Sequence, residues 1–182
     1  MDDEARLFDR ATALPPCDSR LAEIHEYWRS LSGEPDGTLP GRQHFDPSRI
    51  ARLLPWVWLL DISRQPLRFR YRLIGTAHVE ASGWDATGRW LDEVHPRFLT
   101  SPAHPQFCAV AERAVIAYYQ GRPTYVVQKD FIQIERLVMP LAQDGRQVDM
   151  LLGITVLLAS GEKPRRLEPA AGALDLLANG RR

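Results

Sequence analysis

Two clusters in the middle of the chain combine a histidine with carboxylates. His78 and Glu80 lie two positions apart, and Asp92 and Glu93 shortly precede His95. Imidazole titrates near neutral pH and an adjacent carboxylate fixes its tautomer, so either histidine could serve as the base of a small-molecule enzyme. Capping of a helix end at the protein surface explains the same residues equally well. Neither cluster includes a second nucleophile or ligands at metal-binding spacing. We therefore predict no catalytic residue and no metal site, and keep the His-dependent enzyme as an alternative.

Three arginines at alternate positions, Arg68, Arg70 and Arg72, form the next candidate group. A period of two is typical of a strand with one buried face, so the guanidinium groups share the other face. Such a row is either a solvated, ion-paired surface, in which each pair contributes ~0–1 kcal/mol, or a docking surface. The docking surface would serve an acidic partner or the protein's own helices. We include all three arginines in the predicted interaction surface.

Composition narrows the classes of function. The chain has 182 residues, 45% hydrophobic and 25% charged, which is typical of one globular domain with extensions. Because 23 basic residues balance 23 acidic ones, we expect neither nucleic-acid binding nor attraction to anionic membranes. No apolar run approaches the roughly 20 residues that cross a bilayer, and the acidic start is unlike a secretory signal. Two distant cysteines fit a reducing compartment, so we expect a cytoplasmic protein, by our interpretation bacterial.

A strand hairpin is the central structural unit that we predict. Trp56–Ile62 is a short apolar run that follows Pro55 and precedes a turn, which indicates a buried strand. The alternating segment Leu67–Leu73 comes next and predicts a half-buried strand that ends at Gly75. The two strands are therefore expected to pair antiparallel.

Turn residues and apolar spacing predict the remaining elements. In chain order these are helices at 18–32, 46–54, 76–82, 90–94 and 107–120, and strands at 124–131, 133–142 and 148–159. The order is that of an α+β fold with one five-stranded antiparallel sheet, helices between strands two and three on one face, and a preceding amphipathic helix.

The last predicted strand is apolar on both faces, so both faces need cover. The short helices cover one, and the other requires the N-terminal helix, a second subunit, or both. Leu21, Ile24, Trp28 and Leu31 form one apolar stripe on that helix, and each contributes roughly 1.5–3 kcal/mol when buried. We assign the stripe to the predicted interaction surface of a dimer or partner. Packing against its own sheet is the alternative.

Several short sequence motifs occur along the chain in a characteristic order. They are Leu53-Leu54-Pro55, Leu60-Asp61, Phe69-Arg70-Tyr71-Arg72-Leu73-Ile74-Gly75-Thr76, Thr87-Gly88, Gly121-Arg122-Pro123 and Leu137-Val138-Met139-Pro140-Leu141. With the element order, they resemble the PAS sensory domain, and in particular small stand-alone bacterial PAS proteins. The resemblance implies a PAS-like domain over residues 45–159, a helical extension and linker over 1–44, and a flexible tail over 160–182.

The resemblance also implies a role. Proteins of this kind are non-enzymatic sensors or adaptors that act through ligand binding, dimerisation or contact with a signalling partner. We therefore expect a homodimer, with a signalling protein such as a histidine kinase as a further partner and no membrane insertion. Functional residues of the family lie in a cavity between the sheet and the longer helix. This places Tyr71 at the floor and Trp84, Phe107 and Tyr118 around it, although aromatic residues at such positions are usually core.

Cofactor-binding members of the family carry signatures that this chain lacks. The Asn-Cys-Arg motif of flavin photosensors is absent, and Cys108 in Phe-Cys-Ala does not replace it. Some haem-binding members use a histidine on the longer helix, whereas His104 only precedes our predicted helix and His95 lies in a loop. We predict no cofactor, allow an unknown small ligand, and keep a haem- or flavin-binding sensor as an alternative.

Overall fold

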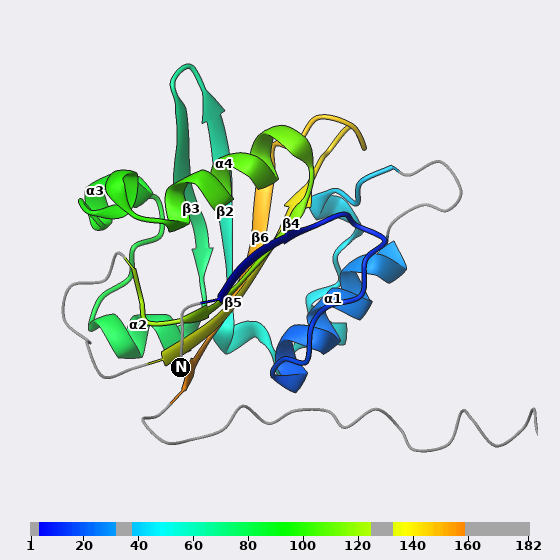
Figure 1. Ribbon diagram of the computed structural model, residues 1–182, viewed down its shortest axis with the longest axis horizontal. Coiled ribbons are helices and arrows are strands. Elements are labelled where there is room, and N and C mark those ends of the chain that lie inside the picture. The colour runs from blue at the N-terminus through cyan, green and yellow to red at the C-terminus, as the bar shows by residue number, and fades with distance from the viewer. Residues whose placement is uncertain (1–3, 32–37, 125–132, 159–182) are drawn as a thin grey trace, which may run out of the picture.

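The computed structural model describes residues 4–31, 38–124 and 133–158 and has an α+β fold, as predicted. Its antiparallel sheet has the strand order β1-β4-β5-β6-β2-β3 (Figure 1). The strands are β1 (Glu4–Phe8), β2 (Val57–Arg64), β3 (Leu67–Ile74), β4 (Ile116–Gly121), β5 (Gln133–Leu141) and β6 (Met150–Leu158). The helices are α1 (Ser19–Leu31), α2 (Thr76–Ser82), α3 (Leu91–Val94) and α4 (Ala103–Arg113), with 3-10 turns at Arg42–His44, Pro47–Ile50, Leu54–Trp56 and Phe98–Thr100.

The predicted hairpin is confirmed by β2 and β3, which pair antiparallel along their length. Phe69 and Tyr71 are buried as the alternation predicts, but Leu73 is 39% exposed. The register shifts between Leu59 and Leu60, so a bulge near the end of β3 turns Leu73 away from the buried face. The predicted helix at 46–54 is instead a pair of 3-10 turns, although Asp46 does cap the first by accepting a hydrogen bond from Ser48 N.

Helix α4, which corresponds to the predicted helix at 107–120, both begins and ends earlier than predicted. It ends at Arg113, Ala114 takes a left-handed conformation with φ of 54°, and Ile116–Gly121 is the buried strand β4. A run rich in β-branched and aromatic residues that is buried on both faces favours a strand over a helix. The helix begins at Ala103, because a proline is tolerated in the first turn, so His104 belongs to it after all. The predicted strand at 124–131 lies, except for Thr124, outside the described residues.

The sheet has six strands among the described residues, whereas five were predicted. Two of the six were not predicted, since β1 lies within the segment predicted to be loose and most of β4 within the predicted helix at 107–120. Every residue of β1 pairs with β4 from Glu4 to Phe8. Its middle three residues are exposed, so backbone hydrogen bonds rather than burial hold it at the sheet edge. An edge strand of this kind leaves little periodic signal in a sequence.

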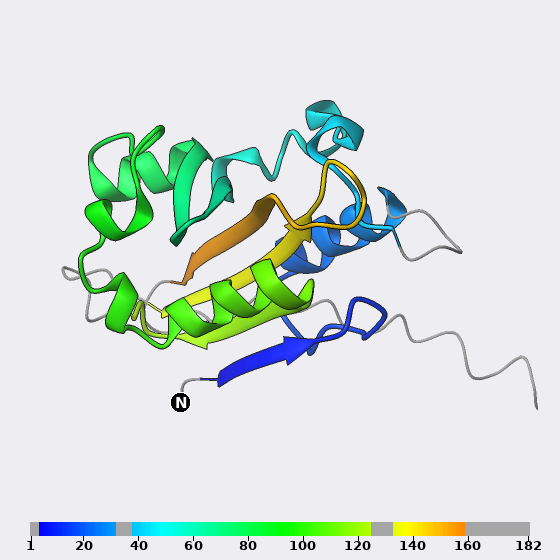
Figure 2. The same cartoon turned by 90° about the horizontal axis from the view of Figure 1, so that it is seen from above.

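Both faces of β6 are covered, as its composition predicts. Helix α1 lies on one side of the sheet, and α2, α3 and α4 lie on the other (Figures 1 and 2). Leu21, Ile24 and Trp28 of α1 are at most 1% exposed, and the Trp28 indole donates a hydrogen bond to Pro140 O of β5 at 3.0 Å. The stripe therefore covers the chain's own sheet here, and only Leu31 is partly exposed. The tail at 160–182 lies outside the described residues.

Candidate functional site

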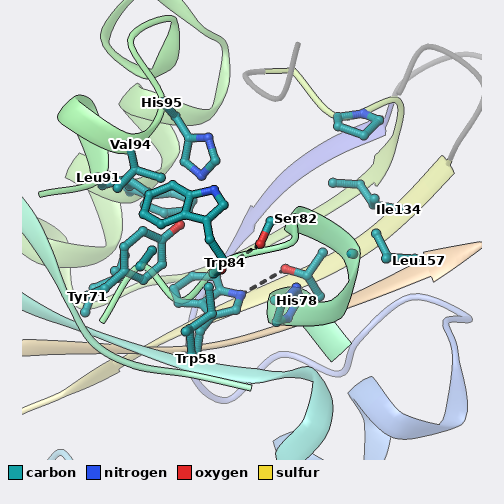
Figure 3. A pocket seen from close by; sticks show the side chains of 17 residues that line it. Trp58, Tyr71, His78, Ser82, Trp84, Leu91, Val94, His95, Ile134 and Leu157 are labelled. Carbon is teal, nitrogen blue, oxygen red and sulfur yellow. Dashed lines mark hydrogen bonds between the residues drawn. The ribbon is translucent and has the colours of Figure 1, made fainter. Parts of the chain in front are cut away.

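A cavity of about 150 Å³ lies between the sheet and helices α2, α3 and α4 (Figure 3). Strands β2, β3, β5 and β6 contribute its floor, and the three helices and the loop after α2 contribute its walls. Its lining is mostly aromatic and aliphatic, with His78, His95, Ser82 and Thr155 as polar members. The volume is below the roughly 300–1,000 Å³ of sites for drug-sized ligands.

Trp58 is the largest side chain of the floor, and a glycine opposite makes room for it. Trp58 pairs with Gly153 of β6, where an added Cβ would lie 2.0 Å from the indole Cζ2. The indole stacks on Phe107 of α4 at 5.7 Å between centroids and donates a hydrogen bond to Thr155 Oγ1 at 3.0 Å. Three elements thus fix one aromatic ring at the cavity wall.

His78 is held by the turn that precedes β2. Helix α2 begins after Gly75, and a Cβ there would lie 2.3 Å from Pro55 O, so only glycine lets α2 approach this closely. His78 Nε2 lies 2.8 Å from Trp56 O. Because a carbonyl only accepts, Nε2 carries the proton and Nδ1 is an acceptor while the ring is neutral. Burial lowers the pKa of His78, which keeps the ring neutral at pH 7.

His95 lines the opposite wall and is also neutral. Burial lowers its pKa to about 4, and its ring meets Tyr71 edge to face at 6.5 Å. The carboxylates of the second predicted cluster, Asp92 and Glu93, both pair with Arg68. In the first cluster, His78 binds Trp56 O through its Nε2.

Three of the four predicted ligand-binding residues line the cavity and one does not. Tyr71, Trp84 and Phe107 do, with Trp84 44% exposed. Tyr118 lies on β4, where it pairs with Leu137 of β5, and its hydroxyl donates to Glu135, the residue that binds Asp18 N at the start of α1. It points away from the cavity because residue 118 lies on a strand and not on the predicted helix. Sequence reasoning missed Trp58, and the glycine within β6 was the available signal.

The predicted arginine row is bound mainly by its own chain. Arg68 pairs with Asp92 at 3.0 Å and stacks on Trp90 at 4.3 Å. Arg70 donates to Gly88 O at 2.8 Å, and Arg72 is 67% exposed. Arg68 and Arg70 therefore hold the segment around α3 against β3. This is the alternative in which the arginines bind the protein's own helices.

A buried polar cluster on the opposite face fixes the start of α1. Asp18 N donates to Glu135 Oε2 at 2.6 Å, and both residues are at most 1% exposed. The Asp18 carboxylate accepts from Arg20 N at 2.9 Å and also pairs with the Arg20 guanidinium. Burial and then the Glu135 charge raise the pKa of Tyr118. Burial and then the same charge raise the pKa of Cys17 to about 12, so this thiol is not a reactive thiolate.

Trp56 lies between this cluster and the cavity. Its carbonyl accepts the hydrogen bond from His78, and the Arg20 guanidinium lies over its ring at 4.6 Å. One residue of the 3-10 turn therefore contacts both a cavity wall and the first turn of α1.

Neither a cluster of metal-ligating side chains nor a membrane-spanning helix occurs in the described part of the chain. No three or more His, Cys, Asp or Glu side chains in the described ranges gather as ligands for a metal ion. None of the described helices is both long and apolar enough to cross a bilayer.

Comparison with known proteins assigns the family. A family model described as PAS domain matches residues 18–156. No curated protein matches the chain. A solved structure titled "Structure of an RNA-binding Light-Oxygen-Voltage Receptor" is similar with a TM-score of 0.47 and 12% identity, over 87% of this chain and 40% of that chain. This chain thus spans less than half the length of that receptor. On the match over most of its length, this chain belongs to the PAS domain family.

Proposed function

We propose that this PAS domain is a non-enzymatic sensory module that binds a small molecule in the cavity and signals through α1. The cavity between the sheet and helices α2, α3 and α4 carries the proposal. Concave, mostly apolar sites with few polar groups are typical of ligand binding. Asp92 and Glu93, the carboxylates that precede His95 in the sequence, both pair with Arg68, which favours binding over acid–base turnover.

The proposed output is a change in how α1 packs. Trp56 joins the cavity histidine to Arg20, and Arg20 pairs with Asp18 at the start of α1. A ligand that moves His78 would therefore bias the packed helix against a released one. Release would uncover Leu21, Ile24 and Trp28, an apolar stripe suited to a second copy or a signalling protein such as a histidine kinase. We place this exchange in the bacterial cytoplasm, without haem or flavin.

Filling the cavity tests the binding half of the proposal. Ala81 lines the cavity and Ala51 is exposed, so Ala81→Phe fills the site while Ala51→Phe adds the same ring to the surface. Compounds that raise the melting temperature of the natural protein should lose their effect in Ala81→Phe and keep it in Ala51→Phe. Equal responses in both variants would contradict binding in this cavity.

Hydrogen exchange tests the output half. Ligand binding should change the exchange protection of α1 amides, and Trp56→Leu should reduce that change because it removes the ring under Arg20. A ligand that binds tightly yet leaves α1 protection unaltered would contradict signalling through this helix. A visible spectrum of the purified protein checks for a tetrapyrrole or flavin, and an absorbance band of either would overturn the cofactor-free proposal.

A further inference from the structure

We infer that the ligand is a neutral molecule of one aromatic ring that donates a hydrogen bond to His78 Nδ1. This inference rests on the proposed function, since it specifies what the cavity would bind. Three properties of the cavity carry it, namely its size, the absence of charge on its described lining, and one acceptor without a partner.

Size limits the ligand to about one ring. An apolar cavity of roughly 150 Å³ in another protein holds benzene, and the cavity here is also about 150 Å³. Trp58, Phe107 and Tyr71 present aromatic surfaces to it. Such surfaces favour a planar ring in offset-stacked or edge-to-face contact.

The lining disfavours charge. Among the described residues that line the cavity there is no aspartate, glutamate, lysine or arginine. A charged ligand would lose its hydration and meet no counter-ion, which is strongly unfavourable in an apolar site. Both histidines are neutral at pH 7, so neither offers a positive charge to a carboxylate.

His78 supplies the acceptor. Its Nε2 proton is donated to Trp56 O, so Nδ1 has a lone pair, and no described residue donates to it. His78 lines the cavity and its Nε2 lies within hydrogen-bond distance of Trp56 O, which leaves Nδ1 for an occupant. A ligand with an O–H or N–H group that reaches this lone pair makes a hydrogen bond that a hydrocarbon of equal size does not make, and so binds more tightly.

Three probes of one ring size separate these properties. Phenol has the donor, toluene lacks it, and benzoate carries a charge. Titrations followed by the indole N–H signals of the tryptophans should show phenol binding roughly tenfold more tightly than toluene, with no binding by benzoate. Tightest binding by benzoate would overturn the neutral assignment, and equal binding of phenol and toluene would overturn the His78 contact.

Variants of His78 assign the selectivity. His78→Phe should bind toluene and lose the preference for phenol, and retained toluene binding shows that the variant is folded. His78→Gln has both a donor for Trp56 O and an acceptor, so it should restore the preference even where His78→Phe does not fold. His25→Phe replaces a buried histidine on the other side of the sheet and should leave the preference unchanged. A preference that persists in folded His78→Phe, or that His25→Phe abolishes, would refute the role of His78.

The outcomes distinguish the two proposals. If toluene binds and Ala81→Phe abolishes that binding, but phenol gains nothing, the ligand class is wrong and cavity binding stands. If none of the probes changes the indole signals and Ala81→Phe behaves like Ala51→Phe with every ligand found, both proposals are wrong.

Discussion

Replacing Gly153 by alanine should move Trp58 into the cavity. The new Cβ would lie 2.0 Å from the indole Cζ2 and 2.2 Å from Cε2 and Cη2. To reach the 3.4 Å of ordinary contact, the ring atom has to retreat by about 1.4 Å. Gly153 lies in the middle of β6 between two paired strands, so its backbone has little freedom to yield. The indole therefore moves, and the free space on its side is the cavity.

The cost follows from what this movement disrupts. Overpacking a core typically costs about 1–3 kcal/mol. Loss of the hydrogen bond from Trp58 Nε1 to Thr155 Oγ1 adds about 1 kcal/mol. We expect Gly153→Ala to lower the free energy of unfolding by about 2–4 kcal/mol, measured by urea denaturation. Binding of any cavity ligand should weaken as well.

Two comparisons isolate the steric cause. In a Trp58→Leu background the ring is gone, so Gly153→Ala should cost less than about 1 kcal/mol. Gly83→Ala meets no atom within 4 Å but has φ of +81°, so it reports backbone strain of about 1 kcal/mol without a clash. A cost for Gly153→Ala that is below about 0.5 kcal/mol, or that is equal in both backgrounds, would refute the steric reasoning.

Three further outcomes are expected. Trp28→Phe removes the hydrogen bond to Pro140 O and should lower the free energy of unfolding by about 1–2 kcal/mol, and a thermal melt unchanged within error would contradict that bond. The free energy of unfolding should fall by about 1–3 kcal/mol as the pH drops from 6.5 to about 4. Over this range His95 binds a proton in the unfolded chain but stays neutral in the folded protein, because burial lowers its pKa. His95→Phe should flatten this profile, and an equally steep one would exclude His95 as its source. Deleting residues 1–8 removes β1 and exposes the backbone hydrogen-bonding groups at the edge of β4. Light scattering should then show association that increases with protein concentration, because an exposed strand edge pairs with other chains. A variant that stays monomeric at all concentrations would contradict the role of β1 as cover for this edge.

Local patterns predicted most of the fold. The alternation in β3, the apolar run of β2 and the stripe on α1 are each properties of one short segment, and each is confirmed. The boundary between α4 and β4 was wrong because Phe107, Val110, Ala111, Ala114 and Tyr118 continue a helical spacing across it. A strand buried on both faces has no alternation to contradict that spacing. The left-handed Ala114 that ends the helix carries no sequence signal of the kind a glycine gives.

The candidate site was less predictable than the fold, because it depends on which face of the sheet each residue occupies. Tyr71 lies on a strand that alternates, so its direction could be inferred. Trp58 lies on a strand that is apolar on both faces, and its sequence does not say which side is the cavity. Only pairing with Gly153, 95 positions away, fixes its side, and such pairing is not a local property.

The arrangement of the sheet bears on how a ligand would affect α1. Cavity and helix lie on opposite faces, so a signal crosses the central strands or passes around their ends. Strand β5 offers the first route, since Ile134 lines the cavity and Glu135 binds Asp18 N on the other face. That strand pairs on both sides and resists displacement. The turn at Trp56 precedes β2 and is held by single turn hydrogen bonds, yet it contacts both His78 and Arg20. Because less paired backbone has to move there, the route through Trp56 is the more compliant of the two.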